Sequence, residues 1–154
     1  MIDRKLYRGG GGVAAEFGHI FTHPPTDRMT NTREAYYEAF ASTTALVKLA
    51  MNADPKCVDG KTIFDKIRKG DKALERIVDQ WADEVSLGLA SFIHVFNPEA
   101  IIVGGGVMEQ QALVQLIEAK SKALVMDSFR DVVILRAALG NKAGVLGAAS
   151  MFLS

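Results

Sequence analysis

Residues 97–107 read N-P-E-A-I-I-V-G-G-G-V, and this stretch decides the fold class. Its centre, residues 100–103, is a short run of apolar residues between turn-forming residues, which is typical of a buried strand in a parallel sheet. Asn97 and Pro98 end any helix before it, because proline lacks a backbone donor and disfavours helical geometry in the preceding residue. The glycines at 104–106 end the strand. The stretch therefore predicts a helix–strand–turn unit of the α/β type.

A long amphipathic helix is predicted immediately before this strand. Asp71 can cap its first turn, because an aspartate side chain accepts hydrogen bonds from the free amides at a helix start. Apolar residues then recur at the i, i+3 and i+4 spacing of one helix face. They are Leu74, Val78, Trp81, Val85, Leu89, Phe92 and Phe96. This face predicts the central helix of the core.

The remaining segments complete an α/β arrangement. Asn31, followed by Glu34, is typical of a helix start. Further helices are expected over 33–52, 62–69, 109–124 and 143–152, a second apolar strand over 132–135, and possible strands at 1–7 and 20–21. We therefore expect a sheet with helices covering both of its faces.

Composition narrows the class of protein. The 154 residues carry 18 Lys plus Arg and 18 Asp plus Glu, and this neutrality argues against nucleic acid as the partner. No apolar run approaches the ~20 residues of a membrane span, and no signal peptide follows Met1. The single cysteine, Cys57, excludes an internal disulfide and a multi-cysteine metal site. We expect one cytoplasmic domain that binds neither nucleic acid nor membrane.

Glycines after an apolar strand suggest nucleotide phosphate binding, since the backbone can approach a ligand closely there. The dinucleotide motif G-x-G-x-x-G fails, because Glu109 occupies its last glycine position when counted from Gly104. Residues 60–62, G-K-T, imitate the end of a P-loop, but Pro55 stands at its first glycine and no strand precedes it. A nucleotide turn and a plain tight turn both remain open.

Glu16 and His19 flank Gly18 in a segment preceded by four glycines, residues 9–12. A carboxylate accepts hydrogen bonds from sugar hydroxyls, and a neutral imidazole both donates and accepts them. These two residues are therefore candidates for a small polar ligand, against the alternative of a flexible glycine loop. His19, His23 and Asp27 could suggest a metal site, but two prolines at 24–25 disrupt the helical spacing that such a site needs.

Four collinear segments resemble the ROK family (repressors, open reading frames and sugar kinases) of the actin-like, hexokinase-type ATPases. They are residues 5–20, which include R-G and A-E-F-G-H, residues 37–42, Y-E-A-F-A-S, residues 97–107, and residues 139–149, L-G-N-K-A-G-V-L-G-A-A. The resemblance covers nearly the whole chain, but only the second half of a family member. It implies an α/β, actin-like or ribonuclease H-like ATPase domain over residues 1–154. This single domain would be the C-terminal lobe, a sheet flanked by helices, with the N-terminal lobe absent.

The resemblance also implies which residues bind ligands. The sugar hydroxyls would be contacted by Glu16, His19 and Glu38. The adenosine and phosphates of ATP, with Mg²⁺, would be bordered by Gly104, Gly105 and Gly106. Gly144 and Gly147 would let the last helix pack closely near the nucleotide. No catalytic residue is implied within this chain, because the family's phosphate loop and catalytic aspartate belong to the half that the resemblance leaves out.

One departure concerns zinc. Family members commonly carry a histidine and a C-x-C-G-x-x-G-C run before the equivalent of Glu38. Here Met29, Asn31 and Tyr36 stand at the cysteine positions. We therefore expect no zinc, and a mobile loop over residues 22–30.

Taken together, the resemblance implies the C-terminal domain of an ATP-dependent hexose kinase, cytoplasmic and homodimeric. The kinase would transfer the γ-phosphoryl group to a sugar hydroxyl, but this chain alone would be inactive. The alternative is the effector-binding half of a sugar-responsive transcriptional repressor. A degenerate half-gene is a third possibility.

Overall fold

The computed structural model describes residue 2 and residues 5–152. The α-helices of this part are α1 (Tyr37–Ala41), α2 (Thr43–Ala53), α3 (Gly60–Arg68), α4 (Lys72–Phe96), α5 (Gln111–Leu124) and α6 (Ala143–Ser150). The strands are β1 (Ala100–Val103) and β2 (Val133–Arg136). Short 3-10 helices lie at η1 (Phe17–His19), η2 (Thr32–Ala35), η3 (Gly106–Glu109), η4 (Asp127–Phe129) and η5 (Gly140–Lys142).

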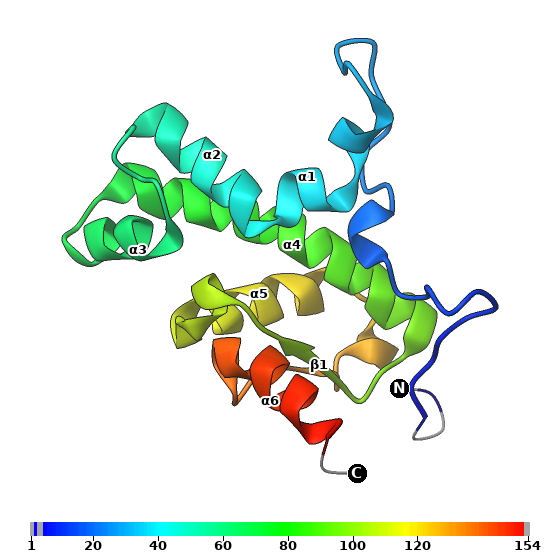
Figure 1. Cartoon of the computed structure of the whole chain (residues 1–154). Helices are drawn as coiled ribbons and strands as arrows, with labels where there is room; N and C mark the ends of the chain where they lie inside the picture. Colours follow the sequence, from blue (N-terminus) through cyan, green and yellow to red (C-terminus); the bar gives the residue numbers. More distant parts are fainter. Residues whose placement is uncertain (1, 3–4, 153–154) are drawn as a thin grey trace.

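Helix α4 is the centre of the molecule, as predicted. The Asp71 side chain accepts from the amides of Ala73 and Leu74, and Asn97 ends the helix in the left-handed conformation at φ 41°. Figure 1 shows α1 and α2 on one side of α4, with α5 and the sheet on the other, while α3 lies beside the first turns of α4 on the side of α5. The predicted apolar face is buried from Leu74 through Leu89, while Phe92 is half-buried and Phe96 is exposed. The main core therefore lies around α4, between α2, α3 and α5.

The two strands pair in parallel, which confirms the predicted strand type. Ala100 is opposite Val133, and Ile102 is opposite Leu135. Ile101 and Ile134 face the core, but Ile102 is 69% exposed and Leu135 is 50% exposed. The prediction of buried strands with both sheet faces covered is therefore wrong for one face. Helix α5 packs against β2, whereas the described side chains of α6 are all exposed. An apolar run shows that a strand can be buried but not which element covers it.

The predicted helix over 33–52 is interrupted. Asn31 caps η2 rather than a long helix, and the chain turns extended at Ser42, with φ −77° and ψ 159°. The Ser42 hydroxyl then accepts from the amide of Ala45 and starts α2. Serine favours this position because its short side chain satisfies a free amide at a helix start. Three short elements thus replace one helix.

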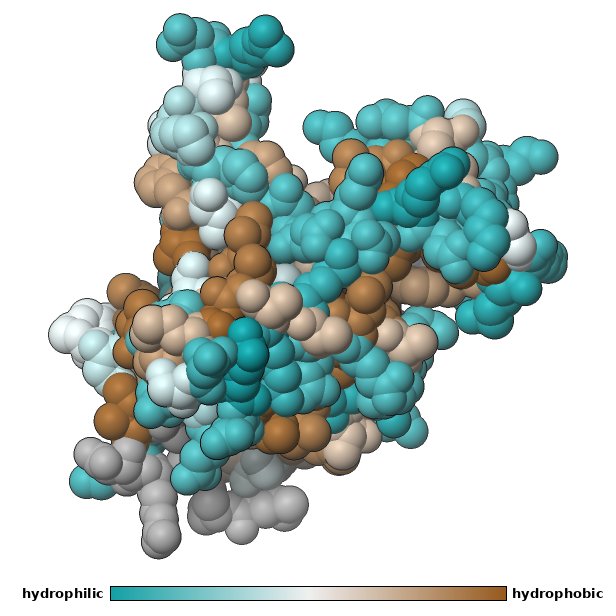
Figure 2. Space-filling view, turned by 180° about the vertical axis from the view of Figure 1, so that it is seen from behind, coloured by the Kyte–Doolittle hydropathy of each residue, from teal (hydrophilic) through white to brown (hydrophobic). Residues whose placement is uncertain are grey.

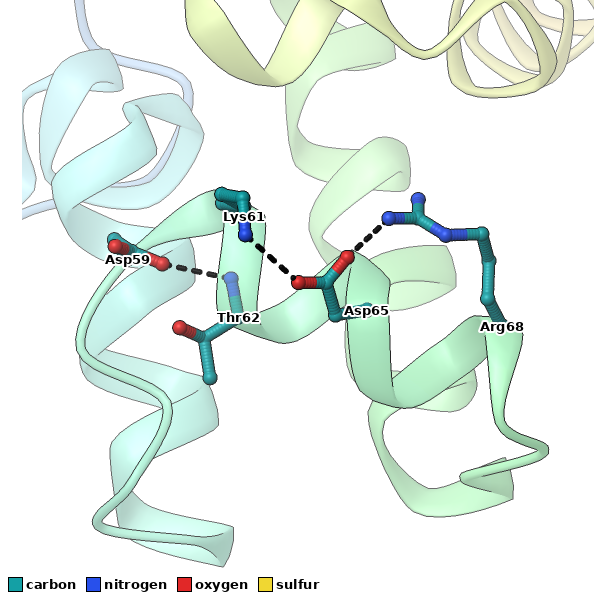
Figure 3. A network of polar contacts seen from close by, with 5 residues as sticks. All are labelled: Asp59, Lys61, Thr62, Asp65 and Arg68. Carbon is teal, nitrogen blue, oxygen red and sulfur yellow. Dashed lines mark hydrogen bonds and ion pairs between the residues drawn. The ribbon is translucent and has the colours of Figure 1, made fainter.

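Helix α3 begins two residues earlier than predicted because Asp59 caps it. The Asp59 Oδ1 atom accepts from the Thr62 amide at 2.7 Å. On the next turn Asp65 forms ion pairs with Lys61 and Arg68 (Figure 3). The preceding segment is a loop after α2 rather than a strand, which agrees with the exclusion of a P-loop.

The remaining predictions are partly met. The second strand and the helices α5 and α6 form within two residues of the expected bounds. Residues 1, 3 and 4 of the expected first strand lie outside the described residues, and Ile2 and Lys5 form a single antiparallel bridge. Phe21 likewise forms one bridge, to Tyr36, instead of a strand. No helix among the described residues is long and apolar enough to cross a membrane.

Candidate functional site

His19 lies between two carboxylates. Its Nδ1 atom is 3.4 Å from Glu16 Oε2, and its Nε2 atom is 3.7 Å from Glu38 Oε1. The three side chains are 51%, 71% and 56% exposed for His19, Glu16 and Glu38 respectively. The structure therefore brings the three sequence-predicted ligand-binding residues together on an open surface.

Two short elements hold these residues side by side. Glu16 immediately precedes η1, His19 is the last residue of η1, and Glu38 lies in the first turn of α1. Both elements lie along the second half of α4 in Figure 1. The amide of Tyr37 donates to the Ile20 carbonyl at 2.8 Å, which joins α1 to the chain after η1. A Cβ atom at Gly18 would lie 3.0 Å from Glu38 Oε2, so a glycine at position 18 gives that carboxylate its room.

Aromatic rings pack against His19 and against η1, the element that carries it. The ring of Tyr36 meets His19 edge-on at 5.0 Å between centroids. Phe17 packs on Phe92 of α4 at 4.3 Å and on Phe96 at 5.5 Å. Sequence reasoning missed these supports, because the contacts join positions that are far apart in the chain.

This arrangement suits a ligand that carries several hydroxyl groups. Two carboxylates offer only acceptors when ionised, and the imidazole between them offers a donor and an acceptor when neutral. A sugar presents neighbouring hydroxyls that both donate and accept. The cluster can therefore bind and orient such a ligand.

A second candidate site lies where the two strands end. The residues after β1 and after β2 lie against each other, since a Cβ atom at Gly104 would be 3.4 Å from Ala137 Cβ. The Ala137 amide donates to the Val103 carbonyl at 2.8 Å. Gly105 has φ 108°, a conformation that favours glycine, and Gly106 then begins η3. Ligands of open α/β sheets bind beyond the carboxyl ends of parallel strands, where this turn lies.

Glycines elsewhere in the chain differ in how closely they pack. Gly144 and Gly147 were expected to allow close packing of α6, but a Cβ atom at either would meet nothing within 4 Å. That expectation is wrong for the described residues, because α6 lies exposed on the surface. Gly60, by contrast, is in tight contact, since a Cβ atom there would lie 2.6 Å from Val107 Cγ1. This contact fixes the start of α3 against η3.

Residues 22–35 project from the body as an arm, and its far end is hydrophilic (Figures 1 and 2). His23 ties its base to α4, with Nε2 3.7 Å from Glu84 Oε2 and its ring 4.4 Å from that of Phe40. Glu84 Oε2 is buried and has no hydrogen-bond partner among the described residues. The predicted mobility of residues 22–30 stays a prediction.

The arm does not fit a zinc ion. Of the three residues at the cysteine positions, Asn31 uses its side-chain oxygen to accept from the Arg33 amide, and Tyr36 packs its ring on His19. Neither they nor Met29 offers a thiolate, the ligand that dominates such sites. In the described part of the chain no group of three or more His, Cys, Asp or Glu side chains is arranged to hold a metal ion.

A separate hollow of about 320 Å³ lies between α3, α4 and α5. Its apolar lining includes Phe64, Ile67, Leu113 and Leu116. None of the six candidate ligand-binding residues lines it.

Comparisons with known proteins find relatives that match nearly the whole chain. A glucokinase from Streptomyces coelicolor is 34% identical over an alignment of 171 positions, which covers 98% of this chain and 54% of the relative. A xylose repressor from Caldicellulosiruptor bescii is 26% identical over an alignment of 169 positions, which covers 100% of this chain and 42% of the relative. The chain spans about half the length of the curated relatives it matches.

The fold is shared with a solved kinase. The crystal structure of a ROK family glucokinase from Streptomyces griseus, in complex with glucose and AMPPNP, matches with a TM-score of 0.82 and 34% identity. The match covers 96% of this chain and 54% of that one. This likeness confirms the predicted actin-like, hexokinase-type fold class. The model of the ROK family matches residues 1–154, and the chain therefore belongs to the ROK family.

Proposed function

We propose that this chain is the C-terminal domain of an ATP-dependent ROK-type sugar kinase. The observation on which the proposal depends is His19, held between the carboxylates of Glu16 and Glu38 at 3.4 and 3.7 Å on an open surface. The glucokinase relatives and the glucose in the Streptomyces griseus complex support a hexose as the ligand. In this proposal the two carboxylates accept hydrogen bonds from the sugar hydroxyls, and His19 also contacts and orients those hydroxyls.

The glycines at 104–106 form the nucleotide side of the proposed site. A turn of small residues with Gly105 at φ 108° leaves the backbone open to a close ligand. ATP bound with Mg²⁺ supplies the phosphoryl group of the reaction. The AMPPNP in the Streptomyces griseus complex supports a nucleotide in this fold. We assign no catalytic role to any residue of this chain.

The uncovered sheet face supports an attached N-terminal lobe. Ile102 and Leu135 expose apolar side chains on a parallel sheet, a type that is almost always covered on both faces. We propose that the other half of a family member's length covers this region. On the family resemblance, we also propose a homodimer in the cytoplasm.

The xylose repressor relative favours one alternative function. The effector-binding half of a sugar-responsive repressor would use the same three sugar contacts without any phosphoryl transfer. Sugar binding is common to both functions, and a bound nucleotide distinguishes the kinase.

The test measures glucose and ATP affinities by calorimetry for the chain and its Glu16→Gln variant. Glutamine keeps the shape but weakens a charge-assisted hydrogen bond that is worth roughly 1.5–3 kcal/mol. Glucose affinity is therefore expected to fall about 10- to 150-fold, and ATP affinity much less. Glu118→Gln is the matched control, because it removes a carboxylate that pairs with Lys122 on α5. Equal losses of glucose and ATP affinity in Glu16→Gln would contradict a direct sugar contact.

A further inference from the structure

Tyr37, the residue before Glu38, spans the space between α1 and α4. Its hydroxyl donates to the Val85 carbonyl of α4 at 2.7 Å, and its amide donates to the Ile20 carbonyl at 2.8 Å. One residue thus joins the start of α1 both to α4 and to the chain that follows η1. Because Glu38 is its neighbour in the first turn of α1, any shift of Tyr37 shifts Glu38.

The ring of Tyr37 occupies a space that only a glycine leaves open. A Cβ atom at Gly88 would lie 2.3 Å from Tyr37 Cζ, 2.5 Å from Cε2 and 2.7 Å from the hydroxyl oxygen. Gly88 is buried in the interior of α4, where glycine weakens a helix relative to alanine. A glycine at such a position has a packing reason, and here that reason is the Tyr37 ring.

The same segment of α4, through Phe92, also contacts η1, which carries His19. The Tyr37 ring meets Phe92 edge-on, with 6.0 Å between centroids and 86° between planes. Phe92 packs in turn on Phe17, the first residue of η1. Residues 85–92 of α4 therefore contact both the element that carries His19 and the element that carries Glu38.

The hydroxyl of Tyr37 is expected to remain protonated and so to remain a hydrogen-bond donor. Burial and, to a smaller extent, the Glu84 carboxylate raise the pKa of the Tyr37 phenol well above its usual range. The hydroxyl therefore stays protonated and keeps its hydrogen bond to Val85 under ordinary conditions.

We propose that Tyr37 is a positioning residue for the sugar-facing cluster: its ring, packed over Gly88 and hydrogen-bonded to Val85, holds Glu38 opposite His19. The effect on sugar affinity rests on the proposed function. The effect on the geometry of Glu38 and His19 does not.

The experiment compares Tyr37→Phe, Gly88→Ala, Tyr37→Leu and the Tyr37→Leu/Gly88→Ala double variant in the full chain. Ser91→Ala is the control, an exposed change on the same helix. NMR follows the His19 ring and the Glu38 side-chain carboxyl signals, calorimetry gives the glucose affinity, and urea unfolding gives the stability.

We expect Gly88→Ala to displace the ring and move both signals. Tyr37→Phe keeps the ring in place but loses the anchor, so it moves them less and weakens glucose binding by at most about fivefold, the factor that corresponds to one neutral hydrogen bond. Once Tyr37→Leu has emptied the space, adding Gly88→Ala should change little. Ser91→Ala should leave all three readouts unchanged.

Unchanged His19 and Glu38 signals in Tyr37→Phe would overturn the proposal, as would a loss of stability in the variants without a change in those signals. Tyr37→Phe decides the matter if Gly88→Ala does not fold. If the wild-type chain binds no glucose, the proposed function fails, whereas the NMR signals still decide the positioning role.

Discussion

Replacing Gly60 by alanine is expected to destabilise the protein, although alanine is the better helix former. Gly60 is the first residue of α3, and the added Cβ atom would lie 2.6 Å from Val107 Cγ1. Val107 is 5% exposed and β-branched, so its methyl group cannot turn away freely. Overpacking of this kind costs about 1–3 kcal/mol, whereas alanine gains at most about 1 kcal/mol in a helix. The net loss expected is on the order of 1–2 kcal/mol.

Urea unfolding followed by the fluorescence of Trp81 measures this loss. Trp81 is the only tryptophan and is 1% exposed, so it reports on the core. Gly144→Ala is the matched control, because its Cβ atom meets nothing within 4 Å. It should leave stability unchanged or raise it by up to about 1 kcal/mol.

The companion variant Val107→Ala tests the cause. Losing its two buried methyl groups costs roughly 2 kcal/mol alone. In the double variant with Gly60→Ala, the new methyl group fills part of the vacated space. The combined loss should therefore fall short of the sum by on the order of 1–2 kcal/mol. Additive losses, or a Gly60→Ala variant as stable as the wild type, would contradict a tight contact between position 60 and Val107.

Three further results are expected. The hydrogen bonds from Thr62 hold the pKa of Asp59 below its usual range, so they contribute stability that is lost as the pH falls below about 4. In Asp59→Asn, the free energy of unfolding measured by urea titration should depend less on pH in this acid range. An unchanged pH dependence would contradict the assignment. Elemental analysis of the purified chain should find no bound zinc, because the arm offers no thiolate, and one tightly held zinc per chain would contradict this. The chain alone should release no ADP with glucose, N-acetylmannosamine, fructose or a β-glucoside, and turnover abolished by Glu38→Ala would show that the chemistry lies in this chain.

The sequence predicted those parts of the fold that depend on neighbours in the chain. The caps at Asp71 and Asn97, the apolar face of α4 and the parallel strands at 100–103 and 132–135 all follow local rules, and they formed within a residue or two. Glu16 and His19 of the His19 cluster (Glu16, His19 and Glu38) were candidates from the sequence itself, and Glu38 came only from the family resemblance. The structure showed the distances between them.

The parts that sequence reasoning missed depend on contacts between distant residues. Ser42 lies within the range predicted as one helix, 33–52, and only its role as the cap of α2 divides that range. The exposure of Ile102 depends on which element covers the sheet, which its apolar neighbours do not reveal. The hydrogen bond from Tyr37 to Val85 joins positions 48 residues apart, and its one local signal is an isolated glycine, Gly88, within the predicted helix.

The central claim is that the His19 cluster faces the sugar and that residues 104–106 face the nucleotide. Mapping amide and side-chain NMR shifts in separate titrations with glucose and AMPPNP tests it most directly. We expect glucose to shift the signals of Glu16, His19 and Glu38, and the nucleotide to shift those of residues 104–106. Glucose-induced shifts confined to the hollow between α3, α4 and α5, with the His19 signals unchanged, would contradict it.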